Sequence, residues 1–204
     1  MKILIANSSH SVYAKTICQN INIAAQFRGT GIAKREPEYI VSKMEKGNAV
    51  IALDGDRFAG FCYIESWSHG KFVANSGLIV APDYRKIGLA KKIKHKVFQH
   101  SRYKYPEAKI FSITTGLAVM KMNSDLGYKP VTFSELTKDQ TFWNGCQSCQ
   151  NYETLQSKNQ KMCFCTGMLY DPKSDQTKTK KGPFNEKVWK RIKDLKKSLL
   201  LKKK

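Results

Sequence analysis

The sequence has no run of eighteen or more apolar residues, and it has few acidic side chains. A membrane-spanning helix needs an apolar run of about that length, so we expect no transmembrane segment. The first six residues are too short to supply the apolar region of a signal peptide. No internal repeat and no aromatic-rich RNA-binding signature is present. These absences together predict a cytoplasmic globular protein.

The shortage of acidic residues is concentrated near the C-terminus. The whole chain has 36 Lys and Arg against 16 Asp and Glu, and residues 173–204 alone contain thirteen against three. The start of that segment is polar and predicts a linker. Beyond Pro183, apolar residues recur at helical spacing with lysines opposite, which predicts a basic amphipathic helix. We therefore expect a domain over 1–172, followed by a linker and a basic C-terminal helix over 173–204.

Two kinds of role fit such a helix. We favour docking of the helix on its own domain or on a second subunit. In the second case the protein would be a homodimer. Contact with nucleic acid or with a membrane surface is the alternative, because basic amphipathic helices and lysine clusters serve both. The shortage of aromatic residues in the segment makes RNA recognition the less favoured of these.

The segment Arg85-Lys86-Ile87-Gly88-Leu89-Ala90 lies between an apolar run and a basic helical pattern. A glycine lets backbone N–H groups approach an anion closely, and the following helix directs its unpaired N–H groups and positive dipole end at the same place. The pattern therefore predicts a phosphate-binding turn. The alternative is a glycine turn that merely begins a helix.

The flanking residues favour the phosphate site. Residues 71–80 predict a strand before the turn, and residues 109–114 predict a second strand, followed by a helix over 117–126 that ends at Gly127. The pattern Arg-x-x-Gly-x-Ala resembles the pyrophosphate-binding turn of the GNAT acyltransferases. The segment 125–131, Asp-Leu-Gly-Tyr-Lys-Pro-Val, resembles the helix-to-strand passage of the same family.

The resemblance implies an α+β fold with a mostly antiparallel mixed sheet flanked by helices. The rest of the chain agrees, and a two-residue turn around Gly55 predicts a hairpin. The other elements expected from periodicity are strands at 2–6, 49–53, 58–67 and 162–170, and helices at 12–25 and 38–46. Residues 136–165 would form a cysteine-rich hairpin insertion.

The resemblance also implies an activity: transfer of an acyl group from acetyl-CoA or succinyl-CoA to an amine. The strand Leu78-Ile79-Val80 would hydrogen-bond the pantetheine arm and polarise the thioester carbonyl. The pyrophosphate would be held by the turn residues Arg85, Lys86, Ile87, Gly88, Leu89 and Ala90. The resemblance does not distinguish the two acyl donors.

Proton transfer is less well defined by the sequence. Glu65 lies on a strand that often lines the acceptor side in the family, and His69 follows in the turn; either could be a solvent-facing residue instead. Many family members carry a tyrosine that protonates the departing thiolate, but the corresponding position here is Asn123. An amide has no proton that titrates near neutral pH. The thiolate would then leave without an acid, or with help from Tyr128.

The acceptor is indicated by a basic loop. Arg28, Lys34 and Arg35 surround two glycines, and guanidinium groups pair bidentately with carboxylates; a solvated loop is the alternative. Further similarity to small stand-alone GNAT proteins of bacterial arginine biosynthesis implies L-glutamate as the acceptor. A protein N-acetyltransferase acting on lysine or N-terminal amines is the other enzymatic hypothesis, and a non-catalytic binding module is the third.

The remaining signal is four cysteines in the second half of the chain. Cys146 and Cys149 form a Cys-x-x-Cys pair, and Cys163 and Cys165 follow after thirteen intervening residues. Thiolate pairs at such spacing bind structural zinc tetrahedrally, although the second pair is one residue tighter than usual. If Cys163 and Cys165 lie on a strand, both face the same side and could ligate together. Reduced thiols packed in the insertion are the alternative.

Overall fold

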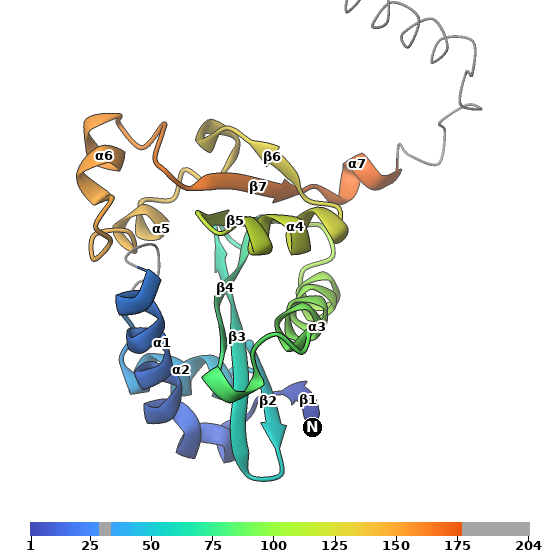
Figure 1. Cartoon of the computed structure of the whole chain (residues 1–204). Coiled ribbons are helices and arrows are strands. Elements are labelled where there is room, and N and C mark those ends of the chain that lie inside the picture. The colour runs from blue at the N-terminus through green and yellow to red at the C-terminus, as the bar shows by residue number, and fades with distance from the viewer. Residues whose placement is uncertain (29–33, 177–204) are drawn as a thin grey trace, which may run out of the picture. The chain divides into compact units, whose positions relative to one another are not determined.

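The computed structural model describes residues 1–28 and 34–176 (Figure 1). Residues Met1–Pro172 form one compact unit, and the chain from Lys173 onward forms a second. The strands are β1 (Lys2–Ile5), β2 (Ala49–Asp54), β3 (Arg57–Trp67), β4 (Phe72–Val80), β5 (Lys109–Thr114), β6 (Lys129–Val131) and β7 (Thr166–Tyr170). The α-helices are α1 (Ala14–Arg28), α2 (Pro37–Glu45), α3 (Leu89–Lys104), α4 (Leu117–Asp125), α5 (Gln140–Asn144), α6 (Tyr152–Ser157) and α7 (Pro172–Gln176). Short 3-10 helices cover Ser8–Tyr13, Pro82–Tyr84 and Phe133–Glu135.

The seven strands form one sheet in the order β1-β2-β3-β4-β5-β7-β6. Every neighbouring pair is antiparallel except β4 and β5, which run parallel. The β4–β5 pairing covers only Phe72–Ala74 against Lys109–Phe111. Beyond these residues the two strands have no register, so the sheet splits in its middle. The mixed, mostly antiparallel sheet that the sequence predicted is confirmed.

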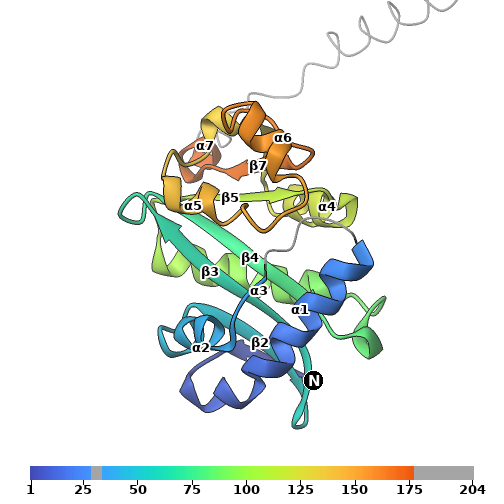
Figure 2. The same ribbon diagram turned by 90° about the vertical axis from the view of Figure 1, so that its left-hand side faces the viewer.

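Helices cover both faces of the sheet (Figures 1 and 2). The pair α1 and α2 lies on one face, and α3 lies on the other. Each helix buries the apolar residues that recur every three or four positions, such as Ile17 and Ile21 in α1 and Ile93 and Val97 in α3. The sheet is therefore buried on both faces in its β2–β4 region. The split between β4 and β5 lies at the edge of this region.

A bulge in β4 lies beside the split. Phe61 pairs with Ile79 and Tyr63 pairs with Ser76, so Gly77 and Leu78 have no partner in β3. Gly77 has a φ of +63°, and a Cβ atom there would lie 2.2 Å from Cε1 of Tyr63. Only glycine meets both conditions, because other residues rarely adopt positive φ and would clash with the tyrosine ring. The bulge leaves backbone groups of β4 free at the centre of the sheet.

The connection between β6 and β7 differs from the predicted hairpin. It contains two short helices, α5 and α6, which Figure 1 shows on the same side of the sheet as α1. The last strand begins at Thr166 instead of 162, so Cys163 and Cys165 lie in the loop before it and not on a strand. A second small core holds the insertion in place, with Trp143, Leu155 and Phe111 among its buried residues. Packing of aromatic side chains stabilises the segment, and strand pairing does not. Such packing leaves no periodic pattern in the sequence, so the sequence did not indicate it.

The C-terminal segment is only partly described. Helix α7 occupies the beginning of the predicted linker, and Pro172 at its first position has the φ that a helix start requires. The predicted amphipathic helix beyond Pro183 lies outside the described residues, and its docking or homodimer role stays a prediction. Among residues 1–28 and 34–176, none of the helices has the length and apolar character needed to cross a membrane.

Candidate functional site

The split between β4 and β5 forms the floor of a pocket of about 230 Å³. Residues 75–78 of β4 line one side of the floor, and residues 112–114 of β5 line the other. The bulged residues Gly77 and Leu78 are among them, so their free backbone groups border the pocket. An extended ligand with amide groups could pair with these strand edges as an added strand would.

The predicted phosphate-binding turn leads from the end of β4 into α3. Gly88 is the N-cap of α3 with a φ of +79°, and Lys86 also has a positive φ of 65°. A Cβ atom on Gly88 would meet no atom within 4 Å, so the space above the turn is open. No acidic residue lies in the first turn of α3. The helix N-terminus and this open space suit a phosphate group, whose negative charge the helix dipole stabilises.

The turn and its flanks also show how Arg85 is held. Its Nε donates a hydrogen bond to the carbonyl oxygen of Val80 at 3.2 Å. The side chain is exposed and is tied back to the end of β4, close to the split. The remaining guanidinium nitrogens therefore stand beside the turn, where an added positive charge would attract a diphosphate.

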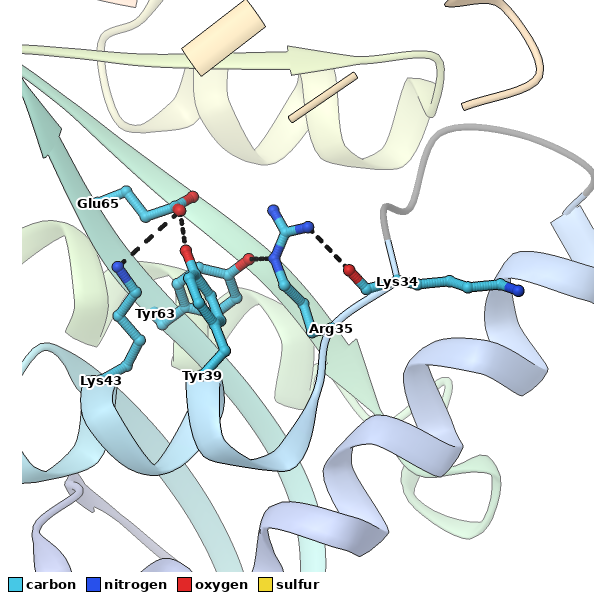
Figure 3. Close-up of polar contacts among 6 residues, drawn as sticks. All are labelled: Lys34, Arg35, Tyr39, Lys43, Tyr63 and Glu65. Carbon is cyan, nitrogen blue, oxygen red and sulfur yellow. Dashed lines mark hydrogen bonds and ion pairs between the residues drawn. The ribbon is translucent and has the colours of Figure 1, made fainter. Parts of the chain in front are cut away.

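A cluster of charged and aromatic side chains forms the wall of the pocket contributed by α2 and β3 (Figure 3). Arg35 Nε donates to the hydroxyl of Tyr63 at 2.9 Å. Glu65 accepts a hydrogen bond from the hydroxyl of Tyr39, and Lys43 Nζ lies 3.9 Å from the same carboxylate oxygen, Oε1. Arg35, Tyr63 and Glu65 line the pocket directly. An amino group and a carboxylate could thus both find a partner on this wall.

The electrostatics of the cluster follow from burial and from its mixed charges. Burial and the negative charge of Glu65 raise the pKa values of Tyr39 and Tyr63, so both hydroxyls keep their protons. Burial lowers the pKa of Lys43, against the opposing effect of Glu65. Burial also acts to lower the pKa of Arg35, but Tyr63 and Glu65 together outweigh it and raise that pKa. Arg35 is therefore a permanent cation in a half-buried site.

The structure separates the three cations of the predicted acceptor loop. Arg35 reaches the pocket, whereas Lys34 is exposed and its side chain points away from the cluster (Figure 3). Arg28 ends α1, and its side chain lies outside the described residues, as do residues 29–33. Among the described side chains of this loop, Arg35 is the one placed to meet a carboxylate in the pocket.

Sequence reasoning identified Glu65 and Arg35 but missed Tyr39, Lys43 and Tyr63. A partial signal was present. Tyr63 and Glu65 are two residues apart on β3 and so share a face, while Tyr39 and Lys43 are four apart on α2 and so share a helix face. The pairing of these two faces across the fold could not be obtained from the sequence alone.

Asn123 and Tyr128, the predicted aids to thiolate departure, are not among the residues that line the pocket. Asn123 is fully buried, its Nδ2 donates to Met168 Sδ at 3.6 Å, and its Oδ1 has no partner among the described residues. The hydroxyl of Tyr128 donates to Asn75 Oδ1 at 3.2 Å, and burial raises the Tyr128 pKa well above its usual value. Tyr128 is thus a hydrogen-bond donor tied to β4, and the role of both residues in the reaction stays a prediction.

The four cysteines of the insertion all line the pocket. Burial, with the neighbouring thiols, raises the pKa of Cys146 to about 11 and that of Cys165 to about 12. Among the described residues, however, no three His, Cys, Asp or Glu side chains are placed so that they could hold a metal ion. The geometry therefore does not support the predicted zinc site. Reduced thiols packed in the insertion stay the alternative interpretation.

The insertion contributes part of the pocket lining, next to residues of β3 and β5. Trp67, Phe111 and Phe142 pack with ring centroids 4.9–5.6 Å apart. All three line the pocket, together with the polar side chains of Asn151 and Tyr152. Arg35 and Cys146 both line the pocket, and the positive charge of Arg35 acts to lower the pKa of the Cys146 thiol against the larger effect of burial. The pocket lining therefore combines a charged cluster, a group of aromatic rings and the thiols of the insertion.

Comparisons with known proteins agree with this architecture. Residues 33–115 match the model of the acetyltransferase (GNAT) family. No curated protein matches the sequence significantly. A Mycobacterium tuberculosis protein, Rv2747, solved in complex with CoA and a second compound, is 14% identical with a TM-score of 0.58 over 84% of this chain and 99% of that one.

Two further solved structures are named for substrates that differ from one another. The N-acetylglutamate synthase of Neisseria gonorrhoeae, complexed with coenzyme A and N-acetyl-glutamate, is 12% identical with a TM-score of 0.59, over 83% of this chain and 34% of that one. The ribosomal-protein-S18-alanine N-acetyltransferase of Escherichia coli is 11% identical with a TM-score of 0.52, over 83% and 92%. At these identities the likeness shows the fold and leaves the substrate open.

A split mixed sheet, a β4 bulge and an open glycine turn before α3, in a segment that matches this family model, agree with an acyl-CoA-dependent N-acyltransferase. Over residues 33–115 the chain is similar to the acetyltransferase (GNAT) family, and its described residues share the fold of the solved structures named above.

Proposed function

We propose that the protein transfers an acyl group from acyl-CoA to the α-amine of a small carboxylate-bearing amino acid, with L-glutamate as the first candidate. The observation that carries the proposal is the placement of Arg35 and Glu65 on one wall of the pocket at the β4–β5 split. A cation and a carboxylate side by side match the two charged groups of a free amino acid.

The donor would lie along the split. The open turn over Gly88 fits a pyrophosphate, and the unpaired backbone of Gly77 and Leu78 fits the pantetheine arm and the thioester carbonyl. When bound, the donor supplies an electrophilic carbonyl carbon and a thiolate leaving group. The Leu78 N–H would stabilise the negative charge that develops on the carbonyl oxygen during attack.

The acceptor would be held by the α2–β3 wall. Arg35 would pair with its α-carboxylate, while Glu65 would accept a proton from its amine, using Oε2 because Oε1 already contacts Tyr39 and Lys43. The neutral amine nitrogen forms a bond to the carbonyl carbon as Glu65 takes one of its protons, and the carbon–sulfur bond breaks. The electron pair leaves with sulfur, and the resulting thiolate takes a proton from solvent or from a nearby donor.

A thiol-release assay tests the proposal. Acetyl-CoA and succinyl-CoA are each offered with single amino acids and with peptides that carry a lysine or a free N-terminus. We expect turnover of glutamate, and we expect Arg35→Gln to reduce its kcat/KM by roughly tenfold or more because a charged contact of about 1.5–3 kcal/mol is lost. Arg57→Gln, which removes an exposed arginine of β3, is the matched control. Thiol release with peptides alone would instead identify a protein acyltransferase.

A further inference from the structure

Lys43 of α2 contacts Glu65 and is not among the residues that line the pocket. Its Nζ lies 3.9 Å from Oε1 of Glu65, and the two side chains are 19% and 14% exposed. In the part of the chain that the structure describes, Lys43 is the one cation within ion-pair distance of this carboxylate. A partly buried ion pair with one member at a pocket lets the other member act on the chemistry indirectly.

The ring of Tyr39 helps to hold Lys43 in place. The two residues are four positions apart on α2, and Nζ of Lys43 lies 4.6 Å from the centroid of the Tyr39 ring. Figure 3 shows Arg35 on the other side of Tyr39, with its Cζ 5.2 Å from the same centroid. The hydroxyl of Tyr39 donates to Oε1 of Glu65, the oxygen that Lys43 also contacts. Both side chains of α2 therefore fix the orientation of the carboxylate through one of its oxygens.

The protonation of Glu65 depends on these neighbours. Burial favours the neutral form of a carboxyl group, whereas a nearby cation and a hydroxyl donor favour the ionised form. Only the ionised form can take a proton from an amine. In β4, the residue paired with Glu65 is Ala74, which carries no charge. The titratable groups that act on Glu65 electrostatically come from β3, from α2 and from the loop before α2: Tyr63, Tyr39, Lys43 and Arg35.

The two cations of this group have different tasks. Tyr39 and Tyr63 keep their protons, so Arg35 and Lys43 are the groups that supply positive charge to Glu65. In the proposed function Arg35 pairs with the carboxylate of the acceptor, which neutralises much of its effect on Glu65. Lys43 then remains as the positive charge that favours the ionised carboxylate when the acceptor is bound.

We propose that Lys43 is a positioning residue of the acyl transfer, whose ammonium group keeps Glu65 ionised and oriented while Glu65 takes a proton from the acceptor amine. The inference rests on the proposed function, in which Glu65 accepts that proton. It does not depend on whether the amine belongs to a free amino acid or to a peptide. The proton passes from the amine nitrogen to Glu65, and Lys43 keeps its own protons throughout.

The test is the pH dependence of turnover in Lys43→Met. Methionine retains a long side chain that can pack on the Tyr39 ring, but it removes the charge. Acyl transfer from acetyl-CoA or succinyl-CoA to L-glutamate, or to a lysine peptide if glutamate is not used, is followed from about pH 5 to about pH 9.5. The ratio of the variant's kcat/KM to that of the wild type is taken at each pH. Ionisation of the acceptor amine affects both proteins equally and cancels in this ratio.

We expect the ratio to be lower at the acidic end than at the alkaline end by roughly threefold or more, because half-maximal activity on the acidic side moves up by about one pH unit. Tyr39→Phe should show the same trend with a smaller change, since a neutral donor favours the carboxylate less than a full charge does. A purely structural role of Lys43 would lower the ratio by the same factor at every pH.

Two control variants isolate the charge at this position. Lys43→Arg keeps the positive charge, and its ratio to the wild type should not vary with pH. Lys46→Met removes an exposed lysine at the end of α2 that forms no ion pair with Glu65 among the described residues, and its ratio should also be independent of pH. Circular dichroism establishes that each variant is folded, and calorimetry should give the wild-type affinity for CoA.

Glu65→Gln separates the failure of this inference from the failure of the proposed function. An inactive Glu65→Gln protein, together with a pH-independent ratio for Lys43→Met, overturns the role of Lys43 and leaves the proposed function intact. Full activity in Glu65→Gln, or a folded wild-type protein that uses neither acceptor, overturns the proposed function and the role of Lys43 with it. A ratio that falls toward acidic pH in Lys43→Met, and not in Lys46→Met, supports both.

Discussion

One buried side chain in this fold, Lys94, carries a charge that is costly to bury. Lys94 of α3 is 1% exposed, and its Nζ lies 5.3 Å from the ring centroid of Tyr128. Burial lowers the pKa of Lys94 to about 8, and the neighbouring Cys62 opposes that shift only in part. A cation–π contact offsets some of the desolvation penalty but not all of it. At neutral pH the protein therefore folds with a buried charge that reduces its stability.

Replacing this lysine should stabilise the protein. Below pH 8 the lysine is protonated in both states, and the folded state bears the full penalty. Between pH 8 and the unfolded pKa near 10.5, the folded state gives up the proton while the unfolded state keeps it, so stability from this group rises with pH. Lys94→Met should raise the free energy of unfolding at pH 7 by up to about 3 kcal/mol, and the gain should shrink toward pH 10.

Urea unfolding at pH 7 and at pH 9.5 measures this effect. Lys96→Met, at an exposed position on the same helix, is the control and should change stability little at either pH. A Lys94→Met protein that is no more stable than the wild type at pH 7 would show that the buried ammonium group is fully compensated.

Among the elements, the turn that leads into α3 allows a sharp test of donor binding. Gly88→Val places a side chain in the open space above the turn, where the pyrophosphate would approach. Gly55→Val in the β2–β3 hairpin imposes a similar strain, because Gly55 has a φ of +60° and equally open surroundings. Both variants should lose stability, by about 1–2 kcal/mol for the positive φ alone.

Binding separates the two variants. Only Gly88→Val should lose affinity for CoA, by roughly tenfold or more, which corresponds to about 1.4 kcal/mol. Isothermal calorimetry on the folded proteins provides the measurement. Equal CoA affinity in the two variants would contradict a phosphate site at this turn.

The elements also show why some features could be predicted from sequence and others could not. The strands β2 to β5 and the turn at Gly88 were predicted because alternation, helical spacing and glycine chemistry are local. The helices α5 and α6 were missed because five or six residues are too few to show a helical period. Tyr39 and Tyr63 were missed for a different reason: each contacts a charged residue of the site only through packing between distant segments.

For the whole molecule, the insertion between β6 and β7 sets the environment of four cysteines and so their protonation. The raised pKa values of Cys146 and Cys165 mean that both are protonated thiols at neutral pH. Because no three metal-ligating side chains in the described part of the chain are placed to share an ion, we expect protein purified without added metal to contain no stoichiometric zinc and a chelator to leave the melting temperature unchanged.

Elemental analysis and thermal unfolding with and without chelator decide the question. Because metal binding adds to folding stability, a zinc site would make the protein melt earlier once chelated. About one zinc per chain, lost in Cys149→Ser but retained in Cys18→Ser at the buried cysteine of α1, would restore the metal interpretation.

The parts of the pocket lining also differ in where they come from along the chain. The split strands, the Arg35–Glu65 cluster, Trp67 and Phe111 lie within residues 35–114, whereas the cysteines, Phe142 and Tyr152 come from the connection between β6 and β7. Exchange of that connection would leave the turn at Gly88 and the split strands as they are. Related enzymes could therefore diverge in acceptor by altering a single peripheral segment, with the machinery for acyl transfer inherited unchanged.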